Sequence, residues 1–132
     1  MNKTIIIAEA GVNHNGDLNI AKKLVDAAVL SGADIIKFQT FKAKNLSLAN
    51  NDLTEYQKRN LLIKQDQQQM LSKLELSDKD HINLFEYCKK SKIEFLTTAF
   101  DKESLGMIKK FNLERYKIAS GEITNIPLVR EI

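Results

Sequence analysis

Short apolar runs alternate with longer amphipathic segments along this chain, and the alternation restricts its fold more than any other feature. The apolar runs, which predict strands, cover residues 4–8, 35–40, 93–98 and 116–120. Apolar residues at helical spacing predict helices at about 18–30, 67–74, 77–91, 101–111 and 127–132. Strands that alternate with helices predict an α/β fold, in which helices pack outside a parallel sheet.

Residues typical of helix ends support these boundaries. Side chains that favour the N-cap position precede three of the helices: Asp17, Ser77 and Asp101. Gly32 follows the first helix as a candidate C′ residue, and Pro127 suits a first helical turn. Four βα units predict either the N-terminal half of a (β/α)₈ TIM barrel or a small flavodoxin-like sheet.

Charge and composition disfavour several classes of partner. The net charge is +3, and the chain has neither a block of five like charges nor a basic stripe with aromatics, so we expect no nucleic acid partner. Residues 5–8 are too short for a signal peptide, and no run approaches the ~20 apolar residues of a membrane span. The sole cysteine, Cys88, lies in the apolar phase of a predicted helix, which indicates a buried thiol in a reducing compartment. We therefore expect a cytoplasmic protein.

Polar side chains stand at the end of every predicted strand. Glu9 and the loop that contains Asn13 and His14 follow the first strand, and Lys37 and Gln39 share one face of the second. An unpaired ammonium inside an apolar strand is costly, so Lys37 requires an anion, either Glu9 or a ligand. The carboxyl ends of the strands are where a βα barrel builds its active site.

The third and fourth predicted strands add a second cation and several hydroxyls. Thr98 ends the third strand, and the fourth carries Lys117, Ser120 and Glu122. Two lysines with two hydroxyls can bind a phosphate or a carboxylate, which predicts an anion site. Glu9 and Glu122 could also form a pair of acid and base carboxylates.

Each of these residues also has a structural interpretation. The two lysines could form structural ion pairs, and Thr97, Thr98 and Ser120 are common in turns. A lone loop histidine such as His14 is more often a hydrogen-bonding residue than a ligand or a base. The chain has no paired histidines at metal-ligand spacing, so we expect no complete metal site in this segment.

Four stretches of the chain resemble the N-terminal half of the sialic acid (nonulosonic acid) synthase family. They read "IIAEAGVNHNGDLNIAKKLVDAA", "SGADIIKFQTFKAKNL", "FLTTAFD" and "YKIASGEITNIP", and with "LSKLEL" they extend over almost all of the chain. In detail they are most similar to bacterial N-acetylneuraminate and N,N′-diacetyllegionaminate synthases. The "TTAF" segment replaces the more usual "STPF" of the family, which keeps Thr98 but loses a proline at Ala99.

The resemblance implies a transferase of carbohydrate biosynthesis that condenses phosphoenolpyruvate with an N-acylated mannosamine-type sugar. In that reaction C3 of the enolpyruvate attacks the sugar aldehyde, water adds at C2, and phosphate leaves by C–O cleavage. It also implies a divalent metal, Mn²⁺ or Mg²⁺, which acts as a Lewis acid. Its ligands are expected in the family's second half.

The resemblance further assigns roles by position. Those that match phosphoenolpyruvate contacts are Lys37, Thr98, Lys117 and Ser120. Glu9 matches an active-site carboxylate, whereas Glu122 and Asn60 match contacts to the sugar. Supporting positions behind these contacts are Gln39, Asn13 and His14.

The sequence departs from the family at its end, because Ile132 precedes the second half of the barrel and the family's C-terminal antifreeze-like domain. Homodimers are expected of the full-length family. A half barrel has unpaired strand edges, so we expect the 132-residue chain alone to be inactive. Two alternatives remain open: a non-catalytic fragment that binds an anion or a complementary chain, and a synthase of heptulosonate or octulosonate phosphates.

Overall fold

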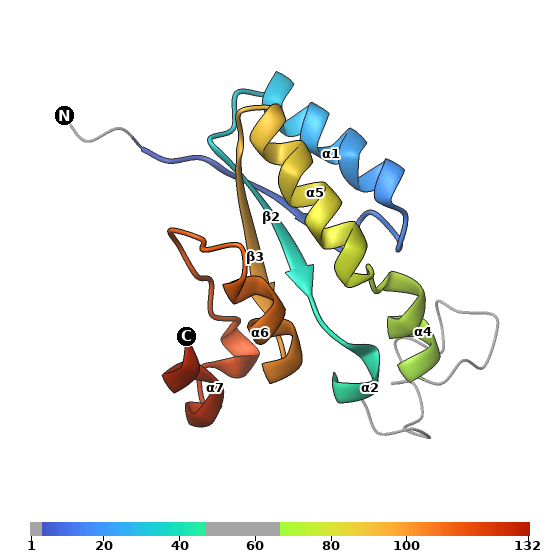
Figure 1. The fold of residues 1–132 in the computed structure, drawn as a ribbon, viewed down its shortest axis with the longest axis vertical. Helices are drawn as coiled ribbons and strands as arrows, with labels where there is room; N and C mark the ends of the chain where they lie inside the picture. Colours follow the sequence, from blue (N-terminus) through green and yellow to red (C-terminus); the bar gives the residue numbers. More distant parts are fainter. Residues whose placement is uncertain (1–3, 47–66) are drawn as a thin grey trace.

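The computed structural model describes residues 4–46 and 67–132, which contain a parallel sheet with helices packed against it (Figure 1). The strands are β1 (Ile7–Gly11), β2 (Ile35–Thr40) and β3 (Glu94–Ala99), and they lie in the order β1–β2–β3. Both strand pairs are parallel. The predicted α/β fold with a parallel sheet is therefore confirmed.

Helices connect and flank these strands. Their bounds are α1 Leu18–Leu30, α2 Ala43–Leu46, α4 Gln67–Leu74, α5 Asp78–Lys90, α6 Lys102–Lys109 and α7 Ile126–Glu131, with a 3₁₀ turn at Ser120–Glu122. The predicted N-caps are confirmed, because Asp17, Ser77 and Asp101 each accept a hydrogen bond from a backbone N–H of the first turn. Gly32 has φ +74°, as expected of a residue that ends a helix in the left-handed conformation.

The main core lies between the sheet and the helices α1 and α5, which run side by side over one face (Figure 1). Each element contributes its apolar side: Ala21, Val25 and Ala28 from α1, Leu84 and Cys88 from α5, and Ile36, Phe38 and Phe95 from the strands. A second cluster joins α6 and α7 to the end of β3. Burial raises the pKa of the Cys88 thiol to about 12, so this cysteine is an inert core residue, as predicted.

The prediction of a buried first strand at residues 4–8 was wrong in its bounds and in its burial. The strand is Ile7–Gly11, and Ile5, Ile6 and Ile7 are each about half exposed. Within the described residues β1 pairs only with β2, so it is an edge of the sheet. Glu9 consequently lies inside the strand, where it pairs in register with Lys37, rather than at its end.

The predicted fourth strand at 116–120 was also wrong. Residues 116–119 have no ladder partner in the part of the chain that the structure describes, and Ser120 begins the 3₁₀ turn. Leu113 and Tyr116 pack into the cluster formed by α6 and α7. This apolar anchoring holds the segment against the helices and not along the edge of β3.

Candidate functional site

Lys37 and Glu9 form an ion pair on the face of the sheet opposite α1 and α5. Their backbones are in register across β1 and β2, and Lys37 Nζ lies 2.5 Å from Glu9 Oε2. The Lys37 side chain is 14% exposed, whereas that of Glu9 is 51% exposed. The predicted need of Lys37 for an anion is therefore met by Glu9. The ammonium carries three donors, so it has capacity for a second anion beside Glu9.

A bulge in β1 brings a third polar group towards this pair. The register shifts between Glu9 and Gly11, and Gly11 takes a left-handed φ of +54°. A Cβ at Gly11 would lie 3.3 Å from Glu9 Oε1 and 3.6 Å from Gln39 Nε2. A carboxylate and an amide thus converge above a position that has no side chain. Bulges next to active sites commonly redirect a side chain in this way.

The two threonines of β3 face opposite sides of the sheet. Thr98 is buried and in register with Gln39, so it lies on the same face as Lys37. Thr97 instead faces the helices, where its hydroxyl lies 2.8 Å from that of Thr40. Thr98 remains a candidate for ligand binding, whereas Thr97 is a structural residue.

The buried hydroxyls of Thr97 and Thr40 form a directed chain that ends at His81 in α5. His81 Nδ1 lies 3.0 Å from the Ser77 carbonyl oxygen, so this nitrogen must be the donor. Burial lowers the pKa of His81, which keeps the ring neutral. Its Nε2 then accepts from Thr40 Oγ1 at 2.9 Å, and Thr40 in turn accepts from Thr97. This chain ties β2, β3 and α5 together.

His14 lies in the loop after β1 and is 1% exposed. Its Nδ1 accepts from the Gly16 N–H at 3.0 Å, and its ring contacts that of Phe38 on the helix-facing side. Burial, with a smaller effect of His81, lowers the pKa of His14 to about 4. The neutral ring therefore carries its proton on Nε2, which is buried and has no hydrogen-bond partner among the described residues. Asn13 is exposed and donates its backbone N–H to the Ala10 carbonyl, as a turn residue does.

The residues predicted on a fourth strand are not gathered around Lys37. Lys117 is exposed, and its ammonium donates to the carbonyl of the adjacent Ile118. Ser120 is exposed in the 3₁₀ turn, and Glu122 accepts a hydrogen bond from the Asn125 side chain at 2.7 Å. These contacts are local to the segment. Asn60 lies outside the residues that the structure describes.

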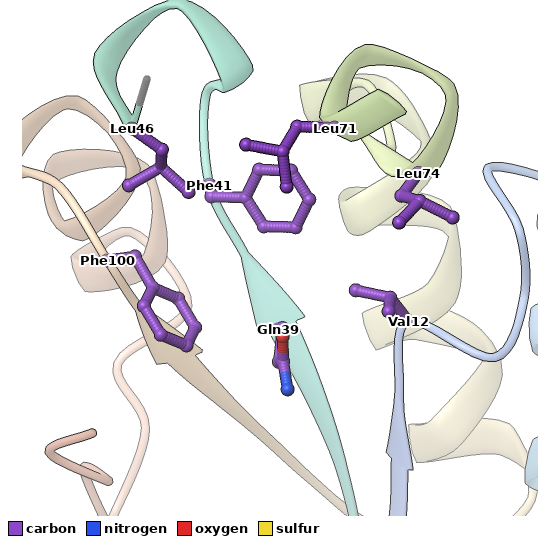
Figure 2. Close-up of a pocket in the computed structure, with 7 residues that line it drawn as sticks. All are labelled: Val12, Gln39, Phe41, Leu46, Leu71, Leu74 and Phe100. Carbon is purple, nitrogen blue, oxygen red and sulfur yellow. The ribbon is translucent and has the colours of Figure 1, made fainter. Parts of the chain in front are cut away.

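Sequence patterns did not reveal an apolar pocket that opens beyond Gln39, at the carboxyl ends of the strands (Figure 2). It has a volume of about 200 Å³. Its lining comes from the segments that follow the three strands and from β2, α2 and α4: Val12, Gln39, Phe41, Leu46, Leu71, Leu74 and Phe100. Figure 2 shows the Gln39 side chain between Val12 and Phe100, below the ring of Phe41. No spacing rule connects such residues.

A polar network next to this pocket fixes the loop after β2. Lys42 Nζ lies 2.7 Å from Asp78 Oδ1 and 3.4 Å from Glu75 Oε1. Burial opposes the charge of Lys42, but these two carboxylates raise its pKa overall. The backbone N–H of Lys42 donates to Asp101, the N-cap of α6. The ends of β2, α5 and α6 are therefore held together by charged hydrogen bonds.

The described residues contain no group of three His, Cys, Asp or Glu side chains that could hold a metal ion. Glu9, the carboxylate at the candidate site, is already engaged by Lys37. The described residues therefore do not by themselves form the metal site that the resemblance implies. In the same residues, no helix is long and apolar enough to cross a membrane.

Comparisons with known proteins agree on one family. The profile of the NeuB family matches residues 24–132. The chain is 51% identical over 132 residues to the N,N′-diacetyllegionaminic acid synthase of Campylobacter jejuni, covering all of this chain and 40% of that protein. It is also 51% identical to the corresponding synthase of Legionella pneumophila, with 95% of this chain and 35% of that protein covered.

A solved structure supports the same assignment. The N-acetylneuraminic acid (sialic acid) synthetase of Leptospira borgpetersenii, in complex with citrate, superposes with a TM-score of 0.80 at 34% identity, over 98% of this chain and 41% of that chain. The chain thus spans about two fifths of the length of these relatives. From the profile match and the identities, we conclude that this chain belongs to the NeuB family.

Proposed function

We propose that this chain forms the phosphoenolpyruvate-binding part of a nonulosonic acid synthase. The observation that carries the proposal is the Lys37–Glu9 pair on the face of the parallel sheet opposite α1 and α5. A cation whose stem is buried is held in place before a ligand arrives, so less conformational entropy is lost on binding. The names of the 51% identical relatives indicate a nonulosonic acid as the product.

In this proposal Lys37 binds the anionic end of phosphoenolpyruvate, and Thr98 donates its hydroxyl from the same face. Glu9 is the more exposed partner of the ion pair, so it can turn from Lys37 towards the sugar or a water molecule while Lys37 stays fixed. C3 of the enolpyruvate then attacks the sugar aldehyde, water adds at C2, and phosphate leaves. The divalent metal would need ligands from other parts of the protein.

Roles for Lys117, Ser120 and Glu122 require a change from the arrangement seen here. Each makes its contacts within its own segment or is exposed to solvent. We propose that this segment adds to β3 as the next strand of a TIM barrel in the complete synthase. The sequential order β1–β2–β3 supports a barrel, because a flavodoxin-like sheet would place β1 between β2 and β3.

Titration of the full chain with phosphoenolpyruvate by isothermal calorimetry tests the proposal. Lys37→Met removes the charge and keeps the buried stem, whereas Lys23→Met removes an exposed lysine on α1 and serves as the control. A hydrogen bond to a charged group contributes about 1.5–3 kcal/mol, so Lys37→Met should weaken binding by roughly tenfold to a hundredfold. Equal affinities of the two variants would refute the role of Lys37.

A further inference from the structure

The β1–α1 loop, residues 12–17, contains Asn15 followed by Gly16, a pair of residues with its own chemistry. It is the one Asn-Gly step in the sequence. The backbone nitrogen that follows an asparagine can attack the side-chain Cγ and close a cyclic imide. Glycine favours this attack most, because it has no side chain to obstruct the approach and its backbone rotates freely. Asn15 is exposed, so water can reach an imide formed there.

The folded loop holds the two reacting atoms of this step apart. Asn15 has φ +51°, in the left-handed region, where ψ is about +30 to +60°. At such values the Gly16 nitrogen lies on the far side of the Cα–C bond from the Asn15 side chain. Closure of an imide needs the nitrogen and the side chain on the same side. The attack therefore requires a large rotation of the backbone between Asn15 and Gly16.

Three contacts oppose that rotation. The Gly16 N–H, whose nitrogen would have to attack, donates to His14 Nδ1 at 3.0 Å. The Asp17 N–H donates to the His14 carbonyl oxygen at 2.9 Å, which closes the turn across Asn15 and Gly16. A Cβ on Gly16 would lie 2.4 Å from the backbone oxygen of Lys73, so Gly16 packs tightly on α4. The His14 ring is 1% exposed, so its accepting nitrogen is itself held in place.

We propose that Asn15 is a modification site, which the folded β1–α1 loop protects and which local opening of that loop exposes. In the opened loop hydroxide takes the Gly16 amide proton, and the nitrogen forms a bond to Asn15 Cγ. The bond from Cγ to the side-chain nitrogen breaks, and ammonia leaves with a proton from water. Water then adds to either carbonyl of the imide, which leaves aspartate or isoaspartate at this position.

The isoaspartate product prevents the loop from closing again. It places the Cβ of the residue within the backbone, so the chain between positions 15 and 16 becomes longer. Gly16 has no space for that change, because its own Cα already approaches the carbonyl of Lys73 closely. Opening of the loop is thereby recorded as a permanent loss of the contact between the end of β1 and α4.

Mass spectrometry of the full chain after incubation at mildly alkaline pH, folded or in guanidinium chloride, tests the proposal without any variant. Two hydrogen bonds close the turn, at about 1 kcal/mol each, so modification of Asn15 should be roughly thirtyfold slower in the folded chain. Asn112 is the internal control, since it is also exposed with a left-handed φ of +50° but precedes Leu113. In the unfolded chain Asn15 should react well before Asn112. Equal rates for Asn15 in the two states, or for the two asparagines in the unfolded chain, would overturn the proposal.

His14→Phe tests the protecting contact directly, because it removes the acceptor of the Gly16 N–H and keeps an aromatic ring against Phe38. Gly32→Ala is the matched control, since it strains the other end of α1, where a Cβ would meet nothing within 4 Å. Loss of one hydrogen bond should accelerate modification of Asn15 roughly fivefold in folded His14→Phe, with no change in Gly32→Ala. An unchanged rate in His14→Phe would overturn protection by His14, and a slower one would show that the ring promotes the attack as a base. Equal acceleration in both variants would show global unfolding in place of local opening.

Discussion

Acid is expected to destabilise this fold through the buried ring of His14. In the folded chain burial holds the pKa of His14 at about 4, whereas an unfolded chain restores the ordinary value of 6.5. Between these two pH values the unfolded state binds more protons than the folded state. Stability is therefore complete above pH 6.5, and it falls as the pH decreases towards 4.

The size of this loss of unfolding free energy follows from the difference between the two pKa values of His14. At roughly 1.4 kcal/mol per pKa unit, a shift from 6.5 to about 4 corresponds to a loss of about 3 kcal/mol of unfolding free energy. Since His14 is 1% exposed, solvent screening reduces this little. Small domains have only ~5–15 kcal/mol in total, so the loss would be easily measured.

Urea unfolding followed by circular dichroism at several pH values between 7.5 and 4 measures this effect. The comparison is His14→Asn, whose side-chain oxygen can still accept from the Gly16 N–H but does not titrate. The variant should be less stable at neutral pH, because it loses contact with Phe38, but its stability should decline less on acidification. His81, whose pKa is also lowered, is present in both proteins, so the difference between the two curves reports mainly on His14. Parallel curves would refute the low pKa of His14.

Three further predictions concern backbone fit and thiol chemistry. Gly11→Ala and Gly32→Ala both force a residue with a side chain into a left-handed conformation, so each variant should lose about 1–2 kcal/mol of unfolding free energy in urea. Only Gly11→Ala, whose methyl group would crowd Glu9, should also weaken phosphoenolpyruvate binding by calorimetry. Equal affinities of the two variants for phosphoenolpyruvate would contradict this prediction. Gly16→Ala should be the least stable of the three variants in urea unfolding, because its Cβ would lie 2.4 Å from a backbone oxygen of α4. A stability equal to that of Gly32→Ala would argue against such close packing of Gly16 on α4. Cys88 should resist a thiol reagent until the chain is unfolded in urea, and rapid labelling of the folded chain would show that the thiol is accessible.

Local signals in the sequence predicted the helices and the central strand. The bounds of α1 and β2 are those expected, because the cap at Asp17, the glycine at Gly32 and the apolar periods act within a few residues. The ion pair between Lys37 and Glu9 was one of two alternatives that the sequence left open, the other being a ligand. A lysine in an apolar strand permits few partners, and a carboxylate on the neighbouring strand is one of them.

The features that sequence reasoning missed depend on contacts between distant segments. The bounds of β1 are set by its register with β2, and the 116–120 segment is held by the packing of Tyr116. The burial of His14 depends on its contact with Phe38, which no local pattern records. The apolar pocket draws its lining from four separate stretches of the chain, so it exists only once the chain has folded.

The order of the strands in the sheet has a consequence for how the chain folds. Each strand pairs with the one that precedes it in the sequence, and a helix lies between them. A new βα unit can therefore add to an edge that already exists, without waiting for residues at the far end of the chain. Each pairing closes only the loop of one βα unit, which keeps the contact order lower than pairing between distant units would.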